Sequence, residues 1–222
     1  MILLVTDTSG KNGCVALARA DSGNNSVDLM EESPLLGGTF SAQLIPQISS
    51  LLAKHQLDKS KIDAFIVVSG PGSFTGLRVG LAAIKALAEI LHKPIVPVSL
   101  LEVVASASEA KGKVLAALDA GRAEVYVGEY DVANGSARLV QEQLLTKDEL
   151  AALAGSRFVI TPDETLAGSL RGSGIAVSAS FPIRAEMIAK IGYRKLRAGE
   201  SVSPDQLEAN YIRHTDAQIF AK

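Results

Sequence analysis

The sequence predicts an α/β protein built from two related units, each with the element order βββαβα. Short apolar segments with strand character alternate along the chain with amphipathic helical patterns. An apolar strand, an Asp-containing turn and a second strand occur at residues 2–18 and again at 114–130, an offset of 112 residues. A chain of 222 residues is long enough for one large domain or two small ones. We therefore expect one unit at residues 1–100 and another at 101–222.

The first unit is expected to begin with a buried strand. Residues Ile2–Val5 are all apolar and lead to the turn sequence Asp7-Thr8-Ser9-Gly10, and a strand covered on both faces shows such a continuous run. Asn12-Gly13 is typical of a tight hairpin turn, so a second strand is expected at Cys14–Ala18. The remaining elements expected here are a strand at 26–32, a helix at 39–55, a strand at 64–69, a helix at 75–92 and a strand at 95–98.

A helix at 99–109 is expected to lead into the second unit, where the pattern repeats less clearly. The apolar strand at 114–118 ends at Asp119-Ala120-Gly121-Arg122, and the alternating segment Glu124–Tyr130 follows it. The other elements expected are a strand at 138–144, a helix at 147–154, a strand at 158–160, a glycine-rich turn at 171–174 and a helix at 183–197. Residues 203–222 are expected to form an irregular arm.

The segment Gly70–Gly80 is expected to form a strand–loop–helix corner, because it joins an apolar strand to a helical pattern. Glycine adopts positive φ at little cost and lets a backbone or a ligand come close, which concerns Gly70 and Gly72. Either Ser73 or Thr75 can cap the helix. A helix N-terminus attracts anions, so a phosphate or carboxylate site is one interpretation and a tight structural turn is the other. The spacing matches neither the dinucleotide-binding motif nor the P-loop.

The helix expected at 75–92 is apolar over nearly twice the width that contact with one sheet requires, which is roughly 100°. One face carries large apolar side chains and the second carries small residues. The large set is Leu77, Leu81, Ile84, Leu87 and Leu91, and the small set is Gly76, Gly80 and Ala83. The second face is therefore expected to pack on another helix, from this chain or from a partner.

Composition excludes several classes of protein. The formal net charge is −2, which gives no global electrostatic argument for nucleic-acid binding. One cysteine, Cys14, rules out a disulfide framework within the chain and a Cys-rich zinc site. No uninterrupted apolar stretch approaches the ~20 residues that span a bilayer, and the N-terminus lacks a basic region. We expect a cytoplasmic protein without membrane contact.

Two carboxylates, Asp7 and Asp119, are expected at the ends of corresponding strands that face a cleft between the units. Such a pair can hold a hydrated Mg²⁺ ion beneath nucleotide phosphates, with the Thr8-Ser9 turn beside it. The alternative is that each carboxylate accepts hydrogen bonds from its own turn.

Other catalytic chemistry has little support in the sequence. The histidines at 55, 92 and 214 are isolated and match no metal-binding spacing. No G-x-S-x-G elbow is present, and Cys14 lies in an apolar strand, which favours an inert thiol. A basic cluster on the last helix is interpreted as a solvated face, with a phosphate contact as the alternative, and it consists of Lys190, Arg194, Lys195 and Arg197.

Four segments together resemble the TsaB (YeaZ) family of bacterial tRNA threonylcarbamoyladenosine biosynthesis proteins. They are Met1–Ser9, Gly70–Gly80, Pro97–Glu102 and Leu118–Tyr126. The likeness covers about the first 130 residues, and Asn210-Tyr211-Ile212-Arg213 is similar to the closing segment of the family. The resemblance implies the duplicated ASKHA fold of actin and the sugar kinases.

The resemblance also implies a non-catalytic subunit that needs no cofactor, with any weak nucleotide or Mg²⁺ binding secondary. Family members pair with the transferase TsaD and, with the ATPase TsaE, support threonylcarbamoyl transfer to the adenosine beside the tRNA anticodon. Two N-terminal helices form the TsaD or homodimer interface in this family, and tRNA is reached through the complex. The interface residues expected on these helices are Leu44, Ile48, Leu51, Gly76, Gly80, Leu81, Ala83, Ile84 and Leu87.

A cleft for an anion or nucleotide is a secondary expectation, and the alternative function is an ASKHA-type ATP-dependent phosphotransferase. The cleft residues would be Asp7, Thr8, Ser9, Gly70, Gly72, Ser73, Thr75 and Asp119. Two departures from the family pattern occur, because Phe40 stands where histidine is common and Gly121 where arginine is common. A phosphotransferase would also need a second substrate site and a general base, and the sequence presents no convincing base.

Overall fold

The computed structural model describes residues 1–107, 111–155, 157–178 and 182–213. The chain divides into two compact units. Residues 1–99 and 184–210 form the first unit, and the described residues of 100–183 with Tyr211–Arg213 form the second. We expected 101–222 to form the second unit, but residues 184–210 pack with the first.

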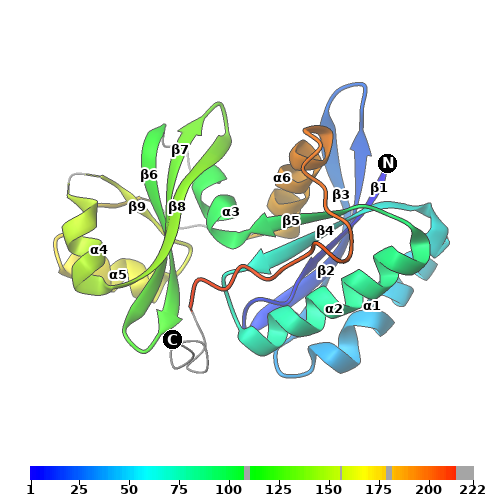
Figure 1. The fold of residues 1–222 in the computed structure, drawn as a ribbon, viewed down its shortest axis with the longest axis horizontal. Helices are drawn as coiled ribbons and strands as arrows, with labels where there is room; N and C mark the ends of the chain where they lie inside the picture. The colour runs from blue at the N-terminus through cyan, green and yellow to red at the C-terminus, as the bar shows by residue number, and fades with distance from the viewer. Residues whose placement is uncertain (108–110, 156, 179–181, 214–222) are drawn as a thin grey trace. The chain divides into compact units, whose positions relative to one another are not determined.

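The first unit contains a five-stranded mixed sheet, two helices on one face and one helix on the other (Figure 1). Its elements are β1 (Ile2–Asp7), β2 (Asn12–Asp21), β3 (Ser26–Leu36), α1 (Phe40–Lys54), a 3₁₀ turn (Lys59–Lys61), β4 (Ile62–Gly70), α2 (Phe74–Leu91), β5 (Ile95–Ser99) and α6 (Ala185–Arg197). The strand order is β3-β2-β1-β4-β5. Strands β1–β3 are antiparallel neighbours, while β4 runs parallel to β1 and β5 parallel to β4.

The second unit repeats this plan. Its elements are α3 (Leu100–Ser106), β6 (Gly112–Gly121), β7 (Glu124–Ala133), β8 (Ser136–Thr146), α4 (Lys147–Ala154), β9 (Val159–Ile160), α5 (Glu164–Gly172) and β10 (Val177–Ser178). The strand order β10-β9-β6-β7-β8 is that of the first sheet. The register shifts between Leu17 and Ala18 in β2 and between Glu129 and Tyr130 in β7, again 112 residues apart. The predicted duplication is confirmed, and the mixed α/β fold agrees with the ASKHA class that the resemblance implied.

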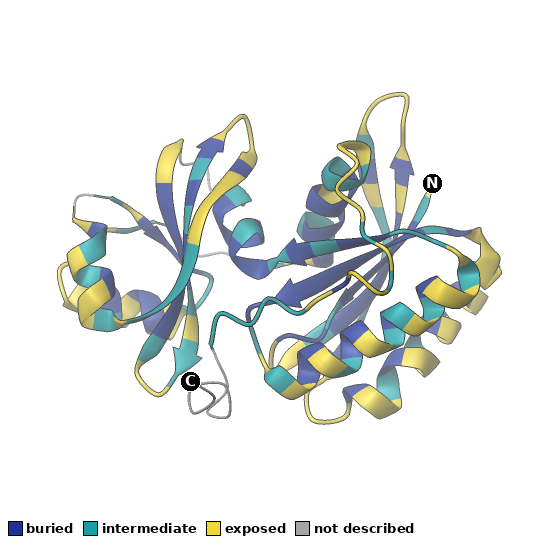
Figure 2. Cartoon of the chain, viewed as in Figure 1, coloured by how far each residue is buried: buried dark blue, intermediate teal, exposed yellow. Residues whose placement is uncertain are grey.

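Helices α1 and α2 cover one face of the first sheet because their apolar stripes meet the same set of strand residues. Leu44, Ile48 and Leu81 pack in one cluster with Leu4 and Phe65. The outward positions of both helices are exposed (Figure 2). Burial of these side chains is the main source of stability for the two helices, since helical propensity alone does not hold a helix of this length.

Helix α6 covers the opposite face of the same sheet. Its buried residues include Ile188 and Gly192, and a Cβ built on Gly192 would lie 2.3 Å from Cγ2 of Ile66. The missing side chain therefore lets the helix backbone approach strand β4 closely. A sheet whose central strands are apolar on both faces needs cover on both, which explains why a helix from the C-terminal part of the sequence completes the first unit.

In the second unit the single covering helix is α3, and α4 and α5 cover the other face. Leu101 and Val104 of α3 pack with Tyr130, whereas Leu150 and Leu166 of the helix pair belong to a separate cluster. Each sheet is thus covered by a pair of helices on one face and by one helix on the other. No helix within the described ranges is long and apolar enough to cross a bilayer.

The local structure differs from the sequence prediction at three places. Asn12-Gly13 lies at the beginning of β2 and not in a turn, and a Cβ on Gly13 would lie 2.4 Å from the carbonyl oxygen of Asp7. Asn134-Gly135 instead forms a tight hairpin, with positive φ at both residues. Helix α5 was not expected, although Asp163 caps it by accepting a hydrogen bond from the Leu166 amide.

Candidate functional site

The glycine-rich loop joins β4 to α2 and its polar groups bond within the chain. Ser73 is the N-cap of α2, and its Oγ accepts a hydrogen bond from the Gly76 amide at 3.3 Å. The Ser73 amide donates to the carbonyl oxygen of Ser9 at 2.6 Å, and the Leu77 amide donates to the carbonyl oxygen of Ser73 at 2.9 Å. Of the two expected caps, Ser73 is the one used, and Thr75 is exposed in the first turn.

The glycines of this corner allow α2 to press against the segment after β1. A Cβ on Gly72 would lie 2.3 Å from the carbonyl oxygen of Ser9, and one on Gly76 would lie 2.1 Å from that of Thr8. A Cβ on Gly80 would lie 2.1 Å from Thr8 Oγ1. The regular spacing of these glycines therefore follows one line of close backbone packing. This geometry favours the structural interpretation of the loop over an anion site.

The carboxylate of Asp7 is engaged by its own turn. Asp7 Oδ1 accepts hydrogen bonds from the Ser9 amide at 2.8 Å and from Ser9 Oγ at 2.6 Å. Burial raises the pKa of Asp7, a nearby Glu32 adds to that rise, and the bonds from Ser9 oppose it. Asp119 is exposed on β6 and belongs to the other unit.

The single cysteine lies beside this acid in the sheet. Cys14 pairs with Asp7 between β1 and β2 and is buried. Burial raises the pKa of the Cys14 thiol, and the charge of Asp7 raises it further, which agrees with an inert thiol. Among the described residues, no group of three His, Cys, Asp or Glu side chains is close enough to hold a metal ion. His214 lies outside the described residues.

Most of the side chains expected at a partner interface point into the core of the first unit. Leu44, Ile48, Leu51, Leu81 and Ile84 are at most 6 % exposed. Gly76 and Gly80 are covered by Thr8, as described above. Ala83 and Leu87 of α2 are half-buried and pack against the core of the first unit. The second apolar face of α2 is therefore satisfied by α1 and by the chain's own β1 turn.

The outward positions of α1 and α2 carry both polar and apolar side chains, and Arg78 and Glu89 of α2 are among the exposed polar ones. We call the apolar set the outer helical face and define it as Ala42, Ile45 and Ala53 of α1 with Ala82, Ala86 and Ile90 of α2, all exposed. Ile45 is 44 % exposed and Ile90 is 70 % exposed. The sequence predicted an interface on these two helices, and periodicity did not show which apolar stripe would meet the sheet.

The C-terminal arm contacts the glycine-rich loop, a relationship that the sequence did not indicate. The Asn210 amide donates to the carbonyl oxygen of Ser69 at 2.7 Å. Gly70 has a φ of +131°, and a Cβ there would lie 2.8 Å from the carbonyl oxygen of Asn210. Leu207 of the same arm is buried in the core beneath α2. The arm thus belongs to the packing of the loop.

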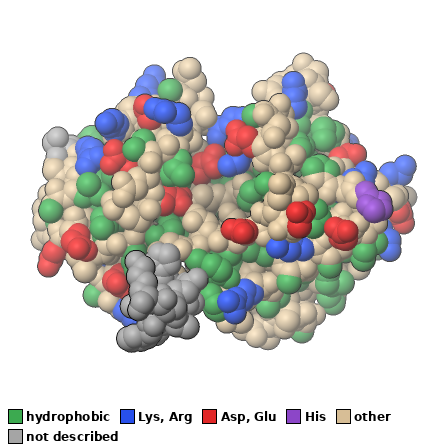
Figure 3. Space-filling view, viewed as in Figure 1, with side chains coloured by type: hydrophobic (Ala, Val, Ile, Leu, Met, Phe, Trp, Pro, Cys, Tyr) green, Lys and Arg blue, Asp and Glu red, His purple; other side chains and the backbone are tan. Residues whose placement is uncertain are grey.

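Two of the four bases in the α6 cluster form ion pairs within the chain, and a third stacks on an aromatic ring. Lys190 pairs with Glu186 at 2.6 Å and Lys195 with Glu200 at 3.6 Å, while the guanidinium of Arg197 lies over the ring of Tyr193. On the face shown in Figure 3, acidic and basic side chains are interspersed. These pairs favour a solvated helix face over a phosphate-binding surface.

The chain matches a known protein family and several curated proteins. The family model described as TsaD, tRNA N6-adenosine threonylcarbamoyltransferase, matches residues 37–181. The chain is 34 % identical over 136 residues to the tRNA threonylcarbamoyladenosine biosynthesis protein TsaB of Bacillus subtilis, which covers 61 % of this chain and 57 % of that protein. It is 31 % identical over 133 residues to TsaB of Escherichia coli, covering 59 % and 55 %. The chain therefore spans about half the length of the curated relatives that it matches.

Solved structures extend the similarity to nearly the whole chain. YeaZ from Pseudomonas aeruginosa superimposes with a TM-score of 0.76 at 26 % sequence identity, covering 95 % of this chain and 99 % of that one. A second crystal structure, of an uncharacterized protein described as similar to the peptidase YeaZ from the same organism, gives 0.76 at 28 % identity, with 96 % and 99 % covered.

Proposed function

This chain belongs to the TsaB (YeaZ) branch of the family that includes the transferase TsaD, and on that premise we propose that it acts in tRNA threonylcarbamoyladenosine biosynthesis. In this proposal it is a non-catalytic subunit. It pairs with a TsaD-like transferase, works together with a TsaE-like ATPase, and meets tRNA through the assembled complex. Isolated copies form a homodimer through the same surface, and the complex acts in the cytoplasm.

The observation that carries the proposal is the outer helical face. Ala82 and Ala86 leave the surface of α2 nearly flat, and Ile45 and Ile90 add exposed apolar side chains. Small residues let a partner helix approach closely, and exposed apolar side chains gain stability when they leave water. A partner with a related fold has a corresponding helix pair that can pack on this face. The two pairs could then pack as one four-helix layer.

The non-catalytic assignment is supported by the hydrogen bonds and the packing of the candidate cleft residues. Asp7 Oδ1 accepts two hydrogen bonds from Ser9, and the loop glycines serve close packing against Thr8 and Ser9. An ATP-dependent phosphotransferase would need Asp7 as an ionised group beside Mg²⁺. The hydrogen bonds from Ser9 and the close packing of the loop glycines favour a structural role for these residues over the phosphotransferase alternative.

The experiment that tests the proposal measures threonylcarbamoyladenosine in bulk tRNA hydrolysates by mass spectrometry. The protein is depleted and then restored as wild type, as Ala86→Glu, or as Ala152→Glu, which changes an exposed alanine of α4 and serves as the matched control. We expect the modified nucleoside to fall on depletion and to return with wild type and Ala152→Glu. Ala86→Glu should fail to restore it.

Two results would overturn parts of the proposal separately. An unchanged nucleoside level after depletion would remove the assigned pathway. Full restoration by Ala86→Glu would keep the pathway but remove the outer helical face as the contact surface. Size-exclusion chromatography of each variant, alone and with the TsaD-like partner, reports directly whether the homodimer and the heterodimer depend on Ala86.

A further inference from the structure

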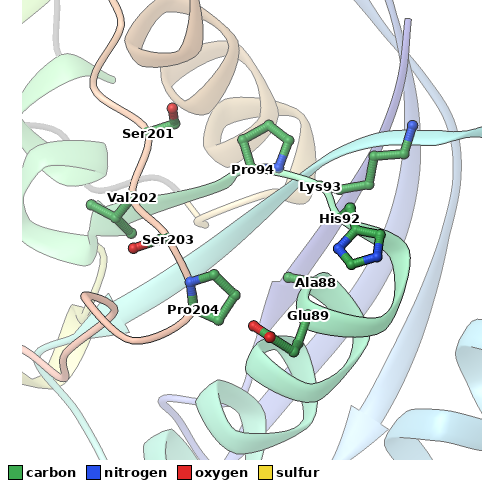
Figure 4. Close-up of a pocket in the computed structure, with 9 residues that line it drawn as sticks. All are labelled: Ala88, Glu89, His92, Lys93, Pro94, Ser201, Val202, Ser203 and Pro204. Atoms are coloured by element: carbon green, nitrogen blue, oxygen red, sulfur yellow. The ribbon is translucent and has the colours of Figure 1, made fainter.

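A groove in the first unit lies between the C-terminal end of α2 and the arm that follows α6. Its volume is about 340 Å³, at the small end of the range for ligand pockets. The lining residues are Ala88, Glu89, His92, Lys93, Pro94, Ser201, Val202, Ser203 and Pro204 (Figure 4). The groove lies apart from both the glycine-rich loop and the six residues of the outer helical face.

The arm is fixed on its inner side, so the groove has defined walls. The Val202 amide donates to the carbonyl oxygen of Ile95 at 2.8 Å, and the Ile95 amide donates back to that of Val202 at 3.2 Å. Ser203 is held by Gln206, whose Oε1 accepts from Ser203 Oγ at 2.9 Å. Pro94 and Pro204 add rigid apolar surface on opposite sides, as Figure 4 shows.

The charge at the end of α2 departs from the usual rule for helices. Helices favour basic residues in the last turn, because the C-terminus carries about half a negative charge. Helices α1, α5 and α6 follow this rule with Lys54, Arg171 and Arg197 among their last residues, whereas α3 and α4, like α2, have no base in the last turn. The last turn of α2 has no base and contains Glu89 instead. The Glu89 carboxylate and the negative end of α2 therefore both lie at the groove, whose lining also includes Lys93.

The contacts of the Glu89 carboxylate are few in the described part of the chain, although Lys85 and Lys93 lie four residues before and after it. Neither a hydrogen bond nor an ion pair engages the Glu89 carboxylate among the described residues. In Figure 4 it extends toward Pro204, into the space beside the arm, whereas the Lys93 side chain extends away from the other lining residues. His92 closes the helix in the left-handed region with a φ of +52°, which directs the chain around the groove.

We propose that this groove binds an ammonium or guanidinium group carried on an aliphatic stem, with Glu89 as the anionic partner. The cationic head would meet the Glu89 carboxylate and the negative end of α2. The stem would lie on Ala88, Val202 and the two prolines, as the apolar part of a lysine or arginine side chain does on other protein surfaces. The same chemistry belongs to a free aliphatic amine and to a basic side chain of a bound polypeptide.

The test uses the full chain and titrates n-butylammonium, followed by amide chemical shifts in heteronuclear NMR. Sodium acetate and butanol are titrated as controls for charge and for the apolar stem. The expected result is a saturable shift confined to residues 88–94 and 201–204. Glu89→Gln, which keeps the side-chain size, should weaken binding roughly fivefold. Glu208→Gln changes an exposed acid of the same arm outside the groove and should leave it unchanged.

A second arm of the test separates the two sources of the cation. A blocked tripeptide with a central lysine is titrated beside the amine. Tighter binding of the peptide assigns the groove to a basic side chain of a polypeptide, and equal or weaker binding assigns it to a small amine. Non-saturable shifts, equal shifts with butanol, or the same affinity for Glu89→Gln would each overturn the proposal.

Discussion

Gly80 of helix α2 lies so close to Thr8 that a Cβ on the glycine would come within 2.1 Å of Thr8 Oγ1. The same line of contact continues at Gly76 and Gly72 against the carbonyl oxygens of Thr8 and Ser9. The glycine-rich loop and the turn after β1 thus form one packed unit, although 60 or more residues of sequence lie between them. This contact determines what the loop can bind, because it occupies the space beside the helix N-terminus.

Replacing Gly80 with alanine should destabilise the protein by roughly 1–3 kcal/mol. The helical preference of alanine, about 1 kcal/mol, is too small to offset the overlap with Thr8 completely. Urea unfolding followed by circular dichroism measures the change. Gly168→Ala in α5 is the matched control, because open space surrounds that position, and it should be neutral or stabilising. Equal behaviour of the two variants would contradict the contact.

Leu81→Glu and Ala86→Glu should behave differently although both lie on α2. Leu81 is 6 % exposed in the core, so a carboxylate there should cost several kcal/mol and abolish cooperative unfolding. Ala86 is exposed, and its variant should keep the wild-type melting temperature within a few degrees. Thermal melting followed by circular dichroism checks both. A folded Leu81→Glu would show that α2 presents its other face to the sheet.

Asp7→Asn should stabilise the protein at neutral pH. Burial raises the pKa of Asp7 in the folded state, so folding favours the protonated form. The stability associated with that form is present at low pH and is lost as pH rises through the folded pKa. Asparagine stays neutral at every pH and can still accept from Ser9. Urea unfolding at pH 7 and pH 4 should show an advantage of the variant that shrinks at the lower pH.

Glu31→Gln should weaken the attachment of α1 to β3 at neutral pH only. Hydrogen bonds from Lys54 at 2.6 Å and His55 at 3.0 Å lower the pKa of Glu31. A carboxyl group whose pKa is lowered in the folded state stabilises the protein at pH values above the pKa of the unfolded state. That contribution is lost as the pH falls through the pKa of the folded state. The difference in melting temperature between wild type and Glu31→Gln should therefore be small at pH 7 and absent near pH 3. A difference that persists at pH 3 would point to lost packing.

Residues 1–99 expressed alone should not fold cooperatively. Helix α6 covers the second face of the first sheet, and Leu207 fills the core beneath α2. Without them a large apolar surface of the sheet remains in water. Circular dichroism should show no sigmoidal melt for this fragment. A cooperative melt like that of the full chain would mean that residues 184–210 are dispensable for the unit.

Much of the local structure could be predicted from the sequence. The apolar run at Ile2–Val5, the strand–loop–helix corner at Gly70–Gly80 and the 112-residue repeat each depend on neighbouring residues or on self-similarity. Strand β9 was predicted, whereas β10 and helix α5 were not. A two-residue strand such as β10 is too short to show periodicity. The over-apolar pattern of α2 is visible in the sequence alone, and the interface predicted from it on α1 and α2 stays a prediction.

Tertiary structure decided which residues are exposed at the surface and which elements belong to each unit. Amphipathic periodicity gives the stripes of α2, but only the packed sheet determines that Leu81 points inward and Ala86 outward. Helix α6 follows the second unit in sequence and packs on the first, because the uncovered face of the first sheet and the close approach at Gly192 are long-range features. Sequence determined the elements and their repetition through local sterics and hydrophobic pattern. The pairing of distant surfaces, which depends on burial and shape complementarity, was determined only in the folded chain.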